Sequence, residues 1–167
     1  GADMVVRQMR CNWVHLMYAW GFPPELEQED WESFRHAAEV YHQAGTPVFA
    51  YIQTSNCVYA GSFRPKDWYA LDSKGKKFHY YTGRYMACLN HPEWRQHLKD
   101  LIRGAIERGA DGLFFDNPWQ GLQPGSLFGA WLGGAGCYCA SCQQRYRADT
   151  GESIPTTITP DEPSTAR

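Results

Sequence analysis

Apolar and polar positions along this chain follow two alternating periods, which predict strands and helices in turn. Residues 13–20 are a short aromatic and apolar run before a Gly-Phe-Pro-Pro turn, typical of a buried strand. Residues 29–44 carry one apolar stripe at helical spacing, formed by Trp31, Phe34, Ala38 and Tyr41. Residues 47–53 repeat the strand pattern after Gly45, a residue suited to a helix C-terminus. Together they predict a βαβ unit with a parallel strand pair and a right-handed crossover.

A long irregular connection, residues 54–90, follows this unit. The segment 72–75 (Asp-Ser-Lys-Gly) is a turn signal between two apolar runs and predicts a hairpin. Connections of this length in compact domains are usually functional. Asn90-His-Pro-Glu then predicts the start of a second helix, with Asn90 as its cap and Glu93 completing a capping box.

The last elements are a third strand, predicted at residues 112–116, and a short helix, predicted near residues 141–148 and ended by Gly151. We expect residues 1–153 to form a single α/β domain. Residues 154–167 have little to bury and are expected to be an extended C-terminal tail.

Three strands are too few to close a barrel. A complete (β/α)8 barrel needs roughly 250 residues, whereas this chain has 167. The predicted fold class is therefore α/β, either a partial (β/α)8 TIM-barrel-like domain with parallel strands or a small open sheet. Open strand edges promote association, so we expect a homo-oligomer or the remainder of a larger barrel to cover them.

Composition excludes some partners and suggests another. Charged residues make up 20% of the chain and the net charge is −2, which argues against a nucleic-acid surface. No apolar run approaches the ~20 residues of a membrane span, so no membrane partner is expected. Aromatic residues reach 15%. They indicate either a large core or a sugar-binding cleft, in which flat rings stack on pyranose rings.

Candidate metal chemistry lies in the segment 137–142, Cys-Tyr-Cys-Ala-Ser-Cys. Three thiols this close in sequence can converge on one point, as a soft tetrahedral cation such as zinc requires. Disulfides or inert buried thiols are the alternatives. Cys137 and Cys139 are too close to pair comfortably with one another, and three thiols on one loop are unusual as core packing. We therefore favour a loop held by zinc after the third strand.

Three segments carry a resemblance to a known family. Residues 86–95 (Met-Ala-Cys-Leu-Asn-His-Pro-Glu-Trp-Arg), residues 111–117 (Asp-Gly-Leu-Phe-Phe-Asp-Asn) and the Cys-x-Cys-x-x-Cys trio resemble clan A glycoside hydrolases. The most similar are family 42 β-galactosidases and related fucosidase-like barrels. The resemblance covers roughly residues 45–155. In family 42 a fourth cysteine joins the trio, so the resemblance implies a structural zinc site at Cys88, Cys137, Cys139 and Cys142.

Candidate catalytic chemistry centres on Asp116, which ends the third strand as a catalytic acid ends a barrel strand. The resemblance to fucosidase-like barrels implies that Asp116 is the nucleophile of a retaining hydrolase. Family 42 enzymes have an Asn-Glu pair here, whereas this chain has Asn117-Pro118, so that general acid/base is missing. A retaining mechanism needs a second carboxyl about 5 Å away, and the sequence does not identify one. Alternatively, Asp116 only accepts backbone hydrogen bonds at a strand end.

Substrate contacts are predicted from the same edge. Tyr51 and Gln53 end the second strand and should face the edge that bears Asp116 and Asn117. Trp68 lies on a predicted loop and is a candidate platform for a sugar ring, as is Trp119. The sequence thus favours a glycoside hydrolase acting on a carbohydrate. The alternatives are a non-catalytic carbohydrate-binding or structural zinc module, and a zinc-dependent module that binds a protein partner.

Overall fold

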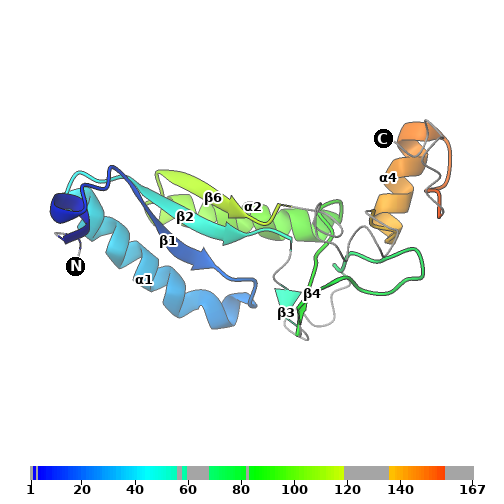
Figure 1. Ribbon diagram of the computed structural model, residues 1–167, viewed down its shortest axis with the longest axis horizontal. Helices are drawn as coiled ribbons and strands as arrows, with labels where there is room; N and C mark the ends of the chain where they lie inside the picture. Colours follow the sequence, from blue (N-terminus) through cyan, green and yellow to red (C-terminus); the bar gives the residue numbers. More distant parts are fainter. Residues whose placement is uncertain are drawn as a thin grey trace.

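The structure is a computed structural model that describes Ala2 and residues 4–55, 58–59, 68–81, 83–118 and 136–156, apart from the side chains of residues 58, 59, 80 and 81. After a short π-helical turn (Met4–Gln8), the elements are β1 (Val14–Ala19), α1 (Pro24–Gln43), β2 (Val48–Gln53), β3 (Val58–Tyr59), β4 (His79–Tyr81), β5 (Arg84–Tyr85), α2 (Pro92–Glu107), β6 (Gly112–Asp116) and α4 (Ala140–Thr150). They form an elongated molecule, with α1 and the larger sheet toward one end and α4 at the other (Figure 1). Most of the predicted tail, from residue 157 onward, lies outside this description.

A parallel three-stranded sheet in the order β1-β2-β6 forms the larger layer. Met17 of β1 lies beside Tyr51 of β2, and Tyr51 lies beside Phe114 of β6. Gln53 is paired with Asp116 in the same register. The predicted parallel pair and the predicted third strand are confirmed. Because all three strands run the same way, their carboxyl ends meet at one edge.

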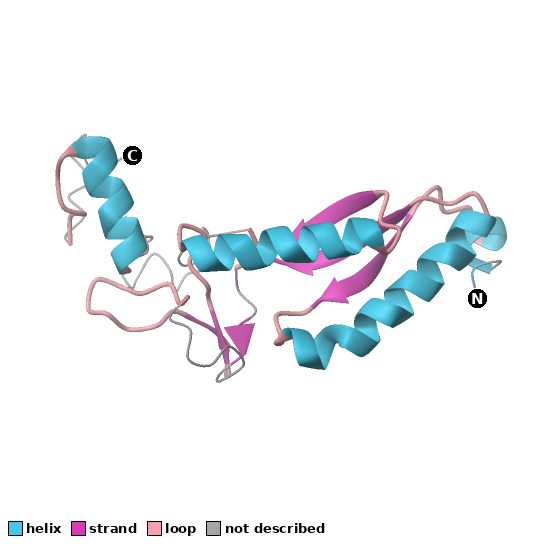
Figure 2. Cartoon of the chain, turned by 180° about the vertical axis from the view of Figure 1, so that it is seen from behind, coloured by secondary structure: helices cyan, strands magenta, loops and turns pink. Residues whose placement is uncertain are grey.

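Both long helices pack on one face of this sheet (Figure 2). The core between them is apolar and closely buried, and consists of Tyr18, Ala19, Phe34, Ala38, Val48, Ala50, Ile52, Leu101 and Ala105. No helix of the described residues covers the opposite face, where the rings of His15, Tyr51 and Phe114 stack. Phe114 remains 41% exposed there. One covered face and one inner face is the layout of a barrel wall, so the structure is consistent with a TIM-barrel-like fragment.

The connection between β2 and α2 folds as a small antiparallel sheet in the order β3-β5-β4. Asp72 Oδ1 accepts hydrogen bonds from the backbone amides of Lys74 (2.9 Å) and Lys76 (2.8 Å), which confirms the predicted turn. The amide of Ala87 donates to the carbonyl of Ser55 (2.6 Å), just beyond β2. The connection is therefore attached to the carboxyl edge of the larger sheet.

The helix ends are partly as predicted. Gly45, after α1, has a φ of +73°, and Gly151, after α4, has a φ of +79°. Both take the left-handed conformation that suits glycine at a helix end. The start of α1, however, is Pro24 rather than residue 29, because proline fits the first turn, where its missing N–H costs nothing. No helix of the described segments is long and apolar enough to span a bilayer.

The predicted capping box of α2 is wrong. His91 occupies the N-cap position, and no side chain caps the helix. Asn90 instead donates through Nδ2 to the sulfur of Cys142 (3.4 Å), and Glu93 accepts from the indole nitrogen of Trp68 (3.1 Å). Both residues are used in tertiary contacts, which a local sequence rule does not anticipate.

Glu27 is a buried carboxyl that fixes the chain after β1. Only 1% of its surface is exposed. Its Oε1 accepts hydrogen bonds from the amides of Trp20 (2.6 Å) and Phe22 (3.0 Å). Burial raises the pKa of Glu27 to about 7, although the backbone donors act in the opposite direction. The folded state thus holds a proton on Glu27 at pH values where the unfolded chain does not.

This shift predicts a pH-dependent stability difference. Because the folded pKa exceeds the unfolded value, the free energy of unfolding should fall as pH rises from about 4.5 to about 7, by about 3 kcal/mol for Glu27 alone. Glu27→Gln keeps a hydrogen-bond acceptor but cannot titrate. Measured by urea unfolding, its free energy of unfolding should therefore fall less between pH 4.5 and pH 8 than that of wild type, by about the same 3 kcal/mol. Glu25→Gln, at an exposed position of the same helical turn, is the control. An equal fall in the free energy of unfolding of wild type and Glu27→Gln would refute this explanation.

Candidate active site and metal centre

Asp116 lies at the carboxyl edge of the sheet, where three donors converge on its side chain. Its Oδ2 accepts hydrogen bonds from the hydroxyl of Tyr51, from Nε2 of Gln53 (3.1 Å) and from Nδ2 of Asn117 (2.5 Å). Within the described part of the chain all three donors reach Oδ2, and none reaches Oδ1. The strand register brings Gln53 beside Asp116, so the neighbouring strand supplies two of these donors. The carboxylate is held in one orientation with one oxygen left for other contacts.

The backbone beyond Asp116 is also fixed. Asn117 has a φ of +52°, in the left-handed region that few residues other than glycine adopt. Asparagine tolerates this region, and such conformations are concentrated at functional sites. The Thr54 hydroxyl donates to the carbonyl of Asp116 (2.5 Å), and the Ser55 hydroxyl donates to that of Asn117. Sequence reasoning identified Asn117 but not Thr54 or Ser55, which lie just after the predicted second strand.

Trp68 and Trp119 are the two predicted platforms for a sugar ring. Trp68 is only 4% exposed, and its ring packs against Trp94 (centroids 5.3 Å apart) and His97 (5.5 Å). A ring buried in this way presents no free face to a sugar, so in this structure Trp68 belongs to the core. Trp119 lies outside the described residues. The sequence pattern could not separate a loop tryptophan from a buried one.

Trp20 is an edge residue that the sequence reasoning did not single out. It follows β1 directly and is 36% exposed. Its ring lies 5.8 Å from that of Tyr51, between ring centroids. Arg84, which is 3% exposed, donates through Nη2 to the Trp20 carbonyl (2.5 Å) and places its guanidinium carbon 5.7 Å from the ring centroid. Together with Glu27 on the amide, these contacts hold Trp20 from two sides.

A second site is formed by the four predicted cysteines. Cys88, Cys137, Cys139 and Cys142 are all buried, and their sulfur atoms lie within 4.8 Å of one another. Cys139 Sγ donates to Cys88 Sγ at 3.4 Å, and Cys88 and Cys142 are also 3.4 Å apart. All four thiols are free, so the disulfide alternative does not hold for these cysteines. The structure therefore brings together the whole predicted ligand set, including Cys88, which is distant in sequence.

The four thiols influence one another electrostatically. Hydrogen bonds from the neighbouring thiols, that of Cys137 first, hold the pKa of Cys139 far below its ordinary value. Hydrogen bonds from Cys137 and Cys88 lower the pKa of Cys142 to about 7. Hydrogen bonds with the same thiols raise the pKa of Cys88. Thiolates thus form at Cys139 and Cys142 more readily than at Cys88. Four thiolates at this separation would repel strongly unless a cation lay among them.

The donor set fits a metal ion. A tetrahedral ion with sulfur ligands at about 2.3 Å keeps its sulfur atoms about 3.8 Å apart, and the spacings found here, from 3.4 Å to at most 4.8 Å, bracket that value. Four cysteines form a closed set with no position for a substrate, which is the pattern of a structural site. The four buried cysteines can therefore hold a metal ion.

The attachment of α4 depends on these thiols. Among the residues of α4 only Cys142 is buried, so the helix has no apolar stripe to dock. The cysteines pack with Ala70, Phe78 and Met86, and the amide of Leu71 donates to Cys137 Sγ (3.4 Å). An isolated helix of this length is marginal in water. The thiol cluster thus anchors α4 to the antiparallel connection.

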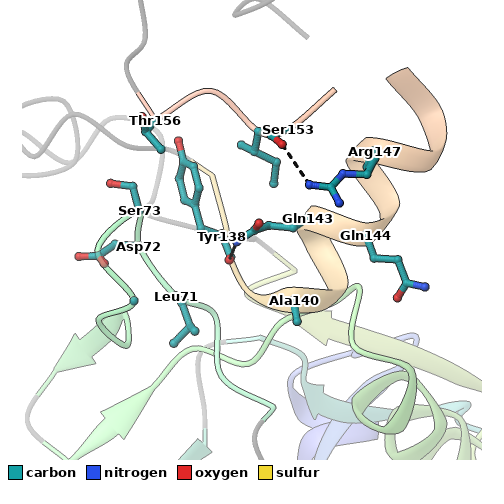
Figure 3. Close-up of a pocket in the computed structure, with 12 residues that line it drawn as sticks. Leu71, Asp72, Ser73, Tyr138, Ala140, Gln143, Gln144, Arg147, Ser153 and Thr156 are labelled. Carbon is teal, nitrogen blue, oxygen red and sulfur yellow. Dashed lines mark hydrogen bonds between the residues drawn. The ribbon is translucent and has the colours of Figure 1, made fainter. Parts of the chain in front are cut away.

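A pocket of about 760 Å³ adjoins the cluster, between the turn at residues 72–75 and α4 (Figure 3). Both polar and apolar residues line it, and two of them are joined by a hydrogen bond from Arg147 to the hydroxyl of Ser153 (3.1 Å). Tyr138 lines it and donates to the carbonyl of Pro155 (2.6 Å). None of the predicted substrate residues that the structure describes lines this pocket.

Comparison with known proteins gives a fold relationship. No protein-family model and no curated protein matches the sequence. The fold is similar to the crystal structure of a maltogenic alpha-amylase from Thermotoga neapolitana, with a TM-score of 0.51 at 14% sequence identity. The match covers 89% of this chain and 37% of that enzyme, so this chain spans little more than a third of its length. At this identity the likeness shows the fold alone.

Removing one thiol should detach α4. We expect the purified protein to carry about one metal ion per chain and Cys139→Ser to lose it, because a serine hydroxyl is a poor ligand for a soft cation. The backbone amides of residues 137–150 should then exchange their hydrogens about as fast as those of a helix that has no tertiary contacts. Cys11→Ser, at a thiol outside the cluster, should retain both the metal and the protection. Unchanged exchange in Cys139→Ser would show that other contacts hold α4.

Proposed function

We propose that this chain is part of a glycoside hydrolase domain in which Asp116 acts on the anomeric carbon, as nucleophile or as stabiliser of positive charge. The convergence of three side-chain donors on one oxygen of a strand-end carboxylate carries this proposal. The carboxyl ends of parallel strands are where α/β barrels place their catalytic groups. The fold likeness to an alpha-amylase, which is a glycoside hydrolase, supports the same class.

The chemistry requires a second group. As a nucleophile, Asp116 Oδ1 forms a bond to the anomeric carbon while the bond to the leaving oxygen breaks, and a general acid protonates that oxygen. Water then releases the sugar from the carboxylate. Glu27 has the raised pKa of such an acid, but it is buried and its Oε1 is bonded to backbone amides. We place the general acid outside the described residues.

The substrate class stays broad. The sequence resemblance favours a β-galactoside or an α-fucoside, through family 42 or the fucosidase-like barrels. The structural neighbour is a maltogenic alpha-amylase, so we add an α-glucoside to these candidates. Each of these three substrates would place a pyranose ring at this edge, with its anomeric carbon near Asp116.

The metal of the four-cysteine site is proposed to be zinc in a structural role. Zinc combines a preference for thiolates with tetrahedral geometry, and the sulfur spacings are compatible with it. Apparent binding energies on the order of 10 kcal/mol are ample to order a helix that has a single buried residue.

Within the described residues, no helix covers one face of the larger sheet. Trp13 is 49% exposed and Phe114 41% exposed on the face of the sheet opposite the two helices, whereas parallel sheets are ordinarily covered on both faces. We assign this cover to further strands of a larger barrel or to a second copy of the chain. Either arrangement would also satisfy the free edges of β1 and β6.

A non-catalytic carbohydrate-binding module is the second candidate. One observation favours it: within the described residues, every hydrogen-bond partner of the Asp116 side chain is a hydroxyl or an amide, and none is a carboxyl. This module would bind sugars without turning them over.

Substitution of Asp116 tests the proposal. On a panel of 4-nitrophenyl glycosides, including β-galactoside, α-fucoside and α-glucoside, wild type should release nitrophenol, and Asp116→Asn should be slower on the order of 10³-fold or more. Asp111→Asn is the matched control at the opposite end of β6, where Asp111 bonds to His42 and the amide of Val48. It should retain activity.

A second experiment distinguishes the two proposed roles of Asp116, nucleophile and stabiliser of positive charge. If Asp116 is the nucleophile, azide should restore turnover to Asp116→Ala and yield a glycosyl azide, because the small anion attacks from the vacated position. A lack of turnover by wild type on every glycoside, with sugar binding retained, would contradict hydrolysis and favour the binding module.

A further inference from the structure

We infer that Trp20 is a substrate-binding residue, whose indole stacks on the pyranose ring of the glycoside that Asp116 attacks. This inference rests on the proposed function and assigns a sugar-contacting residue to it. Trp20 follows the last residue of β1, as Gln53 and Asp116 end β2 and β6. All three therefore lie at the carboxyl edge of one parallel sheet.

The ring of Trp20 is linked to the candidate carboxylate through one side chain. Its centroid is 5.8 Å from that of Tyr51, at an interplanar angle of 55°. The Tyr51 hydroxyl donates to Asp116 Oδ2. A ring bound against Trp20 would thus be next to the phenol that orients Asp116.

The backbone of Trp20 is fixed on both sides by buried side chains. Its amide bonds to Glu27 (2.6 Å) and its carbonyl to Arg84 (2.5 Å). These two partners are 1% and 3% exposed, and they come from a helix and from the antiparallel connection. Buried polar groups are costly unless they are hydrogen-bonded, and the backbone of Trp20 supplies a partner to both Glu27 and Arg84. Trp20 as a whole residue remains 36% exposed.

The other described tryptophans do not share this arrangement. Trp68 and Trp94 are 4% and 1% exposed and belong to the core. Trp13 is 49% exposed but precedes β1, at the amino end of the sheet, where its ring packs against Phe49. Trp31 lies on α1 and is partly buried against the core. Among the described tryptophans, Trp20 alone combines exposure with the edge that bears Asp116. An exposed flat ring beside a carboxylate fits the apolar C–H face of a pyranose.

The test follows indole signals of the ¹⁵N-labelled full-length protein during titration with maltotriose, methyl β-galactoside and methyl α-fucoside. Trp20→Phe and Trp13→Phe assign the two signals by their loss. At least one sugar should shift the Trp20 signal and leave that of Trp13 in place. Trp20→Ala should weaken binding of that sugar by about tenfold or more, and Trp20→Phe, which keeps a flat ring, should weaken it less. Trp13→Ala should bind as wild type does.

Two results overturn the inference and can be told apart. If a sugar binds wild type and Trp20→Ala equally, while Asp116→Asn alters the binding, the assignment of Trp20 is wrong and the carbohydrate site stands. If none of the three sugars binds wild type at millimolar concentration, both the inference and the proposed carbohydrate site fail. Circular dichroism of Trp20→Ala identical to that of wild type excludes misfolding as the cause of lost binding.

Discussion

The convergence of four sulfur atoms is the contact on which the second half of this structure depends. Cys88 belongs to the antiparallel connection, Cys137 and Cys139 lie just before α4, and Cys142 lies in its first turn. The helix brings little else to the contact, since Cys142 is its only buried residue. Thiolates crowded in a buried place repel one another, and a cation converts that repulsion into attraction. A bound ion would thus add to the small apolar cluster of Ala70, Phe78 and Met86 in holding this region together.

The candidate active site depends on a different constraint, the direction of the strands. Parallel strands present their carboxyl ends at one edge, so Tyr51, Gln53 and Asp116 meet without any special local sequence. The antiparallel connection reaches the same edge through Arg84, which bonds to the Trp20 carbonyl. The cluster anchors α4 to this connection, and the connection in turn packs on the edge that bears Asp116. The four-cysteine cluster and the candidate active site are in this way parts of one framework.

Much of this arrangement could be predicted from the sequence because it follows local patterns. Apolar periodicity identified the three parallel strands, and Gly45 and Gly151 correctly indicated helix ends. The thiol spacing together with the family resemblance identified all four cysteines. Such local patterns do not predict tertiary contacts. Glu93, for example, accepts a hydrogen bond from Trp68 instead of capping α2. Burial of Trp68 was missed for the same reason, because loop sequence alone does not show what packs against it.

The account is tested most directly by X-ray absorption at the zinc edge on protein purified without added metal, with the metal content measured in parallel. It predicts about one zinc per chain, surrounded by four sulfur ligands at about 2.3 Å and no lighter ligand. Protein that carries no metal while α4 stays protected from hydrogen exchange would contradict it. So would a zinc ion bound by nitrogen or oxygen, because the four cysteines would then not be its ligands.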